Sequence, residues 1–383
     1  MSVPRRLRLR LSAAVAAAVS LSAAGTAAGF GTTTDPLGQD PVHWKITRAA
    51  VECAAQPRTD VADEPGRCIE PATVSLLSGE GAKSEFGAVE AADIDAFFES
   101  VPHCVDGDYL PPSTGYDPRQ TFAVRTRNLR ACKRYLRQRF ESAIHAASQV
   151  VDDRGWVLPR EASTDGTSAS SRCQFVDEQL GKDRARAFLA GVGIRGPVNA
   201  TKVNVTVQTI MVLAGTGGNP RGESAKCRAL WHLGATLHGV QDAYAHGNWS
   251  DRRDPGPVSI DNPPGLGRTT LNPFMRMVGG TGTPDPRWIT ACYSFLGECE
   301  DRVDHAVFAK DNGVVALQSV PVGRSRLVVG RADERRGRVR GNFGRALDLA
   351  RRASRDVWTE FGRELLRRYP DPPGAPRGRQ MLC

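Results

Sequence analysis

Three side chains of the kind that bind metal ions recur every four residues in the segment WHLGATLHGVQDAYAHGNW, residues 231–249: His238, Asp242 and His246. A step of four residues turns an α-helix only about 40° beyond a full turn, so all three are expected on one helix face. A neutral imidazole and a carboxylate one turn apart can hold a zinc ion, as the paired histidines of H-E-x-x-H do. The segment therefore predicts a metal site on a helix.

The distance between the two outer histidines indicates how many ions that site holds. His238 and His246 would lie roughly 12 Å apart along the helix axis. Zinc–nitrogen bonds of about 2.0–2.1 Å cannot bring both histidines to one ion. The spacing thus predicts two or more ions, with Asp242 as a bridging ligand. The competing interpretation is a core helix whose buried histidines are hydrogen-bonded within the protein.

Three segments carry a resemblance to a known family. HGVQDAYAHGNW, residues 238–249, resembles the central motif of the zinc-dependent phospholipase C superfamily, which also includes single-strand-specific zinc nucleases and heterokaryon-incompatibility (HET-C) proteins. DPVHWKITRAAV, residues 40–51, resembles the N-terminal helix of that group. VDHAVFAKDNG, residues 303–313, resembles a segment of the HET-C-like and secreted actinobacterial CinY-like branch, as does HCVDGDYL at residues 103–110.

This resemblance implies a set of metal ligands contributed by separate parts of the chain: His43, Asp93, His103, His238, Asp242, His246, His305 and Asp311. Two positions have rivals, since Asp95 competes with Asp93 and Asp301 competes with Asp311. The phospholipases have a glutamate one turn after the second-site histidine, where this chain has Ala309. The family enzymes also bind zinc through a free N-terminal amine, which Phe30 would supply if cleavage follows Gly29.

The resemblance implies a zinc-dependent phosphodiesterase with two or three zinc ions, in which Asp93 and Asp242 are the catalytic carboxylates. Phospholipid head groups are the favoured substrate and single-stranded nucleic acid is the second. No nucleophile elbow or Ser-His-Asp pattern occurs, which agrees with attack by a metal-activated water. The alternative is a zinc-stabilised interaction protein without activity, because HET-C-like members lack some enzyme ligands. We favour the enzyme.

The elements that must position these residues are read mainly as helices. Helices are expected near residues 40–54, 91–100, 129–150, 225–248, 301–311 and 342–369, separated by long loops at 55–90 and 250–285. The third and last of these carry apolar residues at three- and four-residue spacing, which marks a buried face. Residues 191–212 are ambiguous between strand and helix. We expect an all-α fold, a helical bundle with a multi-zinc site between its helices.

The N-terminus predicts export. Four arginines precede an apolar stretch at residues 11–21 and a zone of small residues at 24–29, as in a cleavable signal peptide, and the pair Arg5-Arg6 leaves twin-arginine export open. We expect a signal peptide at 1–28, one zinc-binding domain at 29–370 and a tail at 371–383. A secreted protein favours disulfides among its nine cysteines. Cys292 and Cys299 are close enough in sequence for a local pair, Cys383 is the candidate for the unpaired one, and the sequence leaves the connectivity open.

The charge of the chain gives weaker guidance on partners. Removing the four arginines of the predicted signal peptide lowers the net charge from +9 to +5, which suits an anionic substrate but does not favour nucleic acid. No later segment is apolar enough to cross a membrane. The arginines at 331–352 are candidates for contact with an anionic membrane or with nucleic acid, and the competing interpretation, a solvated helix face and loop, is favoured over both.

Overall fold

The computed structural model describes residues 42–52, 71–79, 87–96, 99–152, 158, 173, 224–293, 299–319 and 325–370. The predicted signal peptide and C-terminal tail, Phe30 and residues 191–212 lie outside these ranges.

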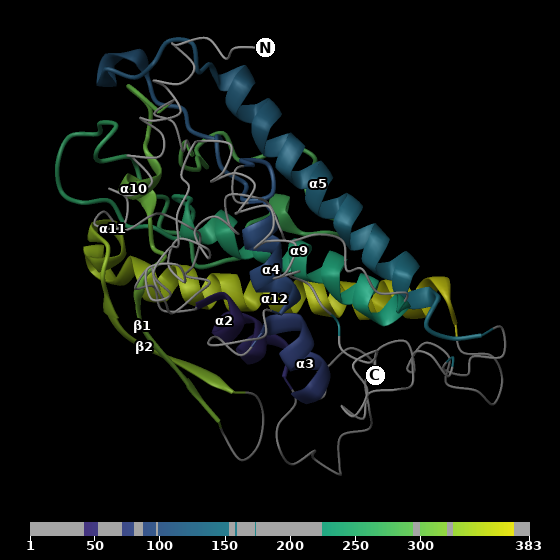
Figure 1. The fold of residues 1–383 in the computed structure, drawn as a ribbon. Helices are drawn as coiled ribbons and strands as arrows, with labels where there is room; N and C mark the ends of the chain where they lie inside the picture. Colours follow the sequence, from purple (N-terminus) through teal and green to yellow (C-terminus); the bar gives the residue numbers. More distant parts are fainter. Residues whose placement is uncertain are drawn as a thin grey trace, which may run out of the picture.

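The described chain is mostly helical (Figure 1). Its α-helices are α2 (Val42–Val51), α3 (Pro71–Ser78), α4 (Ala88–Asp95), α5 (Phe122–Ser148), α9 (Ala225–Ala245), α10 (His305–Phe308), α11 (Arg335–Arg338) and α12 (Asn342–Arg368). Three single-turn 3₁₀ helices are η1 (Pro112–Thr114), η2 (Pro273–Met275) and η3 (Val339–Gly341). Strands β1 (Gly313–Gln318) and β2 (Arg326–Ala332) pair antiparallel as a two-stranded sheet.

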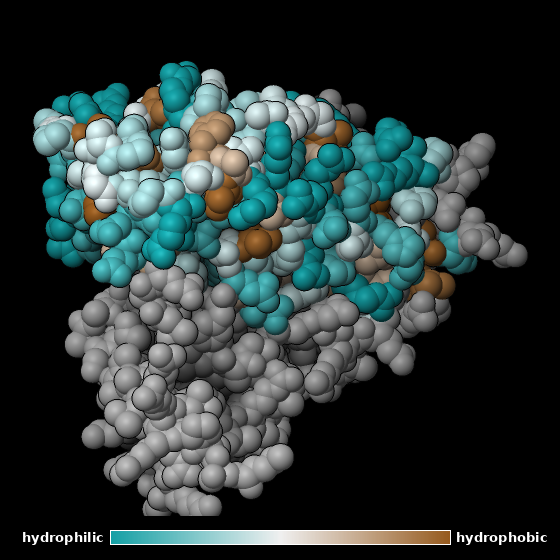
Figure 2. Space-filling view, turned by 90° about the horizontal axis from the view of Figure 1, so that it is seen from above, coloured by the Kyte–Doolittle hydropathy of each residue, from teal (hydrophilic) through white to brown (hydrophobic). Residues whose placement is uncertain are grey.

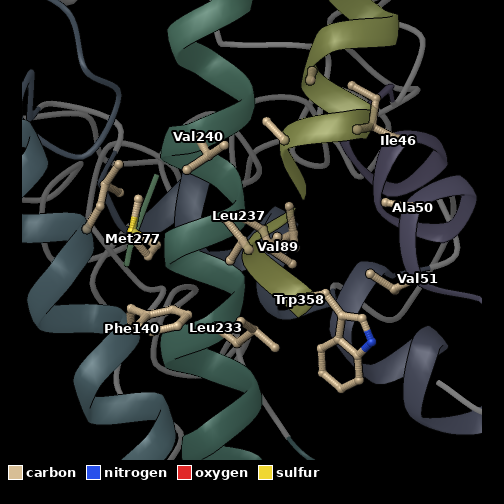
Figure 3. Close-up of a cluster of buried hydrophobic side chains, with 14 of the residues drawn as sticks. Ile46, Ala50, Val51, Val89, Phe140, Leu233, Leu237, Val240, Met277 and Trp358 are labelled. Atoms are coloured by element: carbon tan, nitrogen blue, oxygen red, sulfur yellow. The ribbon is translucent and has the colours of Figure 1, made fainter. Parts of the chain in front are cut away.

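Helix α9 is the centre of the fold. It packs against α4, α5 and α12, and almost every one of its residues is buried. Figure 3 shows Leu233, Leu237 and Val240 of α9 within the core, near Phe140 of α5 and Val89 of α4. A helix buried on all sides must be apolar or have its polar groups satisfied by neighbours. The buried polar side chains His238, Gln241 and Asp242 in the C-terminal half of α9 must therefore find partners on neighbouring segments.

The apolar stripes predicted on the two long helices are confirmed. On α5, Leu129, Leu136 and Phe140 are buried, and on α12 Phe343 and Leu347 are buried. Helix α5 begins where the Thr121 side chain accepts a hydrogen bond from the backbone N–H of Val124 at 3.2 Å. Such a cap satisfies one of the free donors at a helix start.

Two predicted stretches differ from the structure in the first half of the chain. The loop expected at 55–90 contains α3, which starts at Pro71, a residue whose fixed φ suits the first position of a helix. The helix expected at 91–100 begins earlier, at Ala88, and ends at Asp95. Pro71 belongs to the segment that the sequence predicts as a loop, but it is the first residue of a helix.

The helix expected at 301–311 is wrong in extent. Only residues 305–308 are helical, because Asp304 caps the helix by accepting from the Ala306 N–H at 2.8 Å and Ala309 is extended, with ψ 129°. The chain then enters the β1–β2 hairpin, which the sequence did not predict. In β2 only Ala332 is fully buried, so the hydrophobic alternation that marks a strand is weak there.

Three disulfides join described cysteines: Cys104–Cys132, Cys173–Cys227 and the predicted Cys292–Cys299. They are compatible with an extracellular protein. None of the helices in the described ranges combines the length and hydrophobicity needed to span a bilayer. The described residues that are coloured in Figure 2 are mainly hydrophilic on this side, with scattered apolar groups among them.

Close packing around α9 depends on Gly239. A Cβ atom built there would lie 2.4 Å from the Pro102 carbonyl oxygen and 2.7 Å from Leu136 Cδ2. We predict that Gly239→Ala lowers the free energy of unfolding by about 1–3 kcal/mol, although alanine normally favours a helix. Gly282→Ala is the control, since nothing lies within 4 Å of its Cβ position. Denaturant unfolding checks both, and equal stability of the two variants would contradict the close packing.

Candidate metal centre

The eight residues expected to bind metal come from segments far apart in the sequence and are all buried. His43 lies in α2, Asp93 in α4, His103 in the segment after α4, His238 and Asp242 in α9, His246 at the C-cap of α9, His305 in α10 and Asp311 just after α10. No side chain of this set lies on the far side of the molecule from the others, because each is within 4 Å of at least one other member.

Asp242 lies at the centre of this set. Its Oδ2 is 2.8 Å from His103 Nδ1 and 3.0 Å from His238 Nε2. Its Oδ1 is 3.4 Å from His43 Nε2 and 3.7 Å from His246 Nε2. Each oxygen therefore faces a different pair of histidines, which is the arrangement a bridging carboxylate requires.

Gln241 fixes the orientation of His43. The Ser354 hydroxyl donates to the Ala350 carbonyl, so its oxygen accepts from Gln241 Nε2 at 3.0 Å. The Gln241 carbonyl oxygen is then the group that faces His43 Nδ1 at 2.7 Å, and Nδ1 must carry the hydrogen. A neutral His43 thus directs the lone pair of Nε2 toward Asp242.

His103 is held in the same manner by the backbone. Its Nε2 lies 3.1 Å from the Ala96 carbonyl oxygen, which can only accept a hydrogen bond. The lone pair of Nδ1 in the neutral ring therefore faces Asp242 Oδ2. Two imidazole lone pairs directed at one carboxylate repel it unless the rings are protonated or a metal ion lies between the groups. Anchoring one ring nitrogen to a carbonyl while the other is bare is typical of histidines that bind metal.

The donor atoms form three groups whose members lie within 4.8 Å of one another. The first is His43, His238 and Asp242, the second is Asp93, His103 and His238, and the third is His246, His305 and Asp311. Ligand atoms around a tetrahedral zinc ion are separated by about 3.3–3.5 Å, given the usual bond lengths. In the third group His246 Nε2 and His305 Nε2 are 3.4 Å apart, and His305 Nε2 is 3.8 Å from Asp311 Oδ2.

Asp311 gives the strongest indication that a cation belongs in the third group. Both of its carboxylate oxygens are buried and have no hydrogen-bond partner among the described residues. Burial, together with the charges of Glu334 and Asp242, raises the pKa of Asp311 well above its usual value. An isolated buried carboxylate is costly in free energy unless it is neutralised or binds a metal ion.

Protonation differs between the two ends of the centre. Burial lowers the pKa of His246 and His305, that of His305 to about 4, and Lys310 adds to both effects. Burial would also lower the pKa of His43 and His103, but Asp242 and Asp93 outweigh it and raise both values. Without a metal, the charges of Asp242 and Asp93 favour the protonated forms of His43 and His103, whereas burial favours the neutral forms of His246 and His305.

Buried ion pairs position the third group. Lys310 Nζ donates to Asp251 Oδ2 and to the Gly247 carbonyl, both at 3.1 Å, and Arg336 Nε donates to the same Asp251 oxygen at 2.8 Å. These bonds join the segment after His246 to the segment between His305 and Asp311.

The structure also places the rival residues. Asp95 is half-buried near Arg139 and does not join any of the three groups, and Asp301 is exposed. Asp106 and Asp108 form ion pairs with Arg302, and these pairs stabilise the segment that follows His103. The described geometry thus favours Asp93 over Asp95 and Asp311 over Asp301.

Two residues at this centre were missed. Gln241 precedes Asp242 directly, and a buried amide beside a ligand is a usable signal because metal-bound histidines need an acceptor. The Tyr293 ring lies between the two ends of the centre, 5.9 Å from the His103 ring and 5.6 Å from the His305 ring. Burial raises the pKa of Tyr293, so its phenol stays protonated at neutral pH. Nothing in its sequence context indicated this position.

No protein-family model matches the chain, and searches of curated proteins and of solved structures gave no match. The similarity to the zinc-dependent superfamily therefore rests on the quoted motifs.

Removing the acceptor for His43 provides one test of the centre. We predict that Gln241→Leu weakens zinc binding about 10- to 100-fold, since loss of such an anchoring group has that effect at other sites. Thr236→Val is the matched control, because it alters a buried polar residue of α9 whose hydroxyl bonds the His232 carbonyl instead. Titration against a competing chelator measures both, and equal zinc affinities would contradict the orienting role.

Metal binding should also release protons. His43, His103 and Asp311 have raised pKa values in the free protein and must be deprotonated to bind a cation. We therefore expect zinc affinity to fall as the pH falls through those raised values. Calorimetry in buffers of different ionisation enthalpy counts the released protons, and zinc binding without proton release would contradict the assignment.

Proposed function

We propose that this protein is a zinc-dependent phosphodiesterase with two or three zinc ions, related to the CinY-like and HET-C-like branch of the phospholipase C superfamily. The observation that carries the proposal is the position of Asp242, whose two oxygens face different histidine pairs. His238 also belongs to two of the three donor groups. Shared donors favour a multi-metal cluster over separate single-ion sites.

The chemistry of the donor set supports zinc. Its donors are five imidazoles and three carboxylates, without thiolate, which suits zinc sites of the catalytic kind. When bound, such ions lower the pKa of a water molecule and stabilise charge on a phosphoryl group.

The residues of the chain have separate tasks in this proposal. Asp242 sets the spacing of the cluster and balances its charge. Asp93, with Oδ1 3.6 Å from His238 Nε2 and 3.8 Å from His103 Nδ1, is the carboxylate that orients the attacking water or accepts its proton. Gln241 and the Ala96 carbonyl keep His43 and His103 in the tautomers that bind metal.

Phospholipid head groups are the proposed substrate class, on the similarity of the central motif, and single-stranded nucleic acid is the second. Export is supported by the predicted signal peptide and by three disulfides. The enzyme would act outside the cell.

A second candidate is a zinc-stabilised interaction protein without activity. Two observations favour it. All eight proposed ligands are buried, with at most 5% exposure. Ala309, also buried, occupies the position where the phospholipases have a glutamate. A fully protein-ligated site would be structural, whereas a site with an open position would be catalytic.

Asp242→Asn separates the two candidates. Asparagine keeps the size of the side chain but removes the charge that bridges two cations. For an enzyme, we expect hydrolysis of short-chain phospholipid to fall by about two orders of magnitude or more. For a structural zinc protein, we expect a lower melting temperature and no activity in either form.

Asp95→Asn is the matched control, since this carboxylate lies outside the three donor groups. The assay pairs hydrolysis of short-chain phospholipid and single-stranded DNA with thermal unfolding and metal analysis. Wild-type inactivity on both substrates with zinc fully bound would contradict the enzyme. At most one zinc ion per chain under zinc-replete conditions would contradict the multi-metal cluster.

A further inference from the structure

The outward face of α5 carries a row of four exposed arginines: Arg127, Arg130, Arg134 and Arg137. At about 100° per residue they fall within an arc of about 80°, and they extend roughly 15 Å along the axis. We call these four residues the α5 arginine row. A straight helix with such an arc presents all four guanidinium groups to one flat surface.

The charge of this row is not neutralised within the described structure. None of the four arginines makes an ion pair or a hydrogen bond through its side chain with another described residue. Residues 122–140 contain seven basic side chains and no acidic one. The row is therefore a concentrated, uncompensated positive patch.

The basic residues on the inward side of α5, unlike the row, form hydrogen bonds with other segments of the protein. Arg125 donates to the Asp285 and Trp288 carbonyls, Lys133 donates to the Arg276 carbonyl, and Arg139 lies beside His232. These bonds tie α5 to the body of the protein. Only the outward arginines remain for an external partner.

Most of the arginines that the sequence suggested for membrane contact make bonds within the protein instead, whereas Arg338 and Arg340 remain exposed. Arg331 pairs with Asp333, Arg335 with Asp254 and Arg336 with buried Asp251. Arg345 donates to the carbonyls of Ser250 and Gly267. The α5 arginine row is thus the better candidate for an electrostatic surface.

Phosphate is the group that such a row fits, because guanidinium binds phosphate oxygens in a bidentate manner. Surfaces that bind single-stranded nucleic acid combine basic groups with aromatic side chains on which bases stack. Phe122 is an exposed aromatic residue of α5, but it lies about 60° outside the arc of the row and its ring contacts the Tyr109 ring. No aromatic residue of α5 falls within the arc itself. A flat array of phosphates without bases is the surface of an anionic phospholipid bilayer.

We propose that the α5 arginine row docks the protein on anionic phospholipid bilayers. The apolar face of α5 is buried in the core, so docking is electrostatic, reversible and sensitive to salt. It does not depend on the metal centre, and it is expected with or without zinc. Its failure would leave the proposed phosphodiesterase activity untouched.

The test is cosedimentation of the secreted chain with vesicles of phosphatidylcholine, with and without phosphatidylglycerol. Wild type should bind only the anionic vesicles, and added salt should release it. A variant with all four arginines of the row changed to glutamine should lose roughly 100- to 1000-fold in vesicle partitioning, from the usual contribution of each arginine near an anionic surface. The double variant Arg130→Gln, Arg134→Gln should lose about the square root of that factor.

The matched control changes four exposed arginines at scattered positions to glutamine: Arg253, Arg287, Arg331 and Arg363. It removes the same charge, and its partitioning should stay within a few-fold of wild type. Equal losses in the two quadruple variants would overturn the proposal, because net charge alone would then explain binding. Failure of wild type to bind anionic vesicles would overturn it as well, as would tighter binding to a single-stranded oligonucleotide than to vesicles.

Discussion

The whole centre depends on one buried carboxylate. Asp242 is inaccessible to solvent, and burial by itself would raise its pKa, yet His238, His103 and His43 lower that pKa well below the usual value. An ionised carboxylate in the interior is tolerated only when positive charge and hydrogen bonds surround it. Positive charge at Asp242 comes either from protons on its histidines or from metal ions. The position of every histidine in the first two groups follows from that requirement.

The fold supplies this arrangement by bringing segments far apart in sequence close to one end of α9. Gly239 allows the segment at Pro102 to approach α9, and His103 follows it directly. Gly234 does the same for α4, since a Cβ atom there would lie 2.6 Å from Ala88. The close approach of these two segments to α9 thus positions His103 and Asp93, two proposed ligands that do not belong to α9. Cys104–Cys132 then joins the residue after His103 to α5.

The sequence was informative where spacing on one helix was sufficient. His238, Asp242 and His246 follow from helical periodicity, and the apolar stripes of α5 and α12 follow from the same rule. It was less informative where an element depends on contacts distant in sequence. The helix around His305 is short because Asp304 caps its start and because Lys310, just after its end, bonds the buried Asp251. The bond to Asp251 spans 59 residues of sequence, so no local pattern predicts it. The β1–β2 hairpin was missed because β2 has little alternation of burial.

The two halves of the centre differ in the direction in which the pKa values of their histidines are shifted. Near Asp242 and Asp93, negative charge favours protonated His43 and His103, so protons and metal ions compete for the same atoms. Near Asp311, Lys310 and burial keep His246 and His305 neutral, while Asp311 itself retains a proton. Neutral imidazoles are the form that binds metal. The third group therefore has two neutral imidazoles in the free protein and one carboxylate, Asp311, that gives up a proton to bind a cation. In the other groups the raised pKa of His43 and His103 makes protons compete with a metal ion. Lys310 contributes to this difference through charge as well as through the bonds that fix the segment between His305 and Asp311.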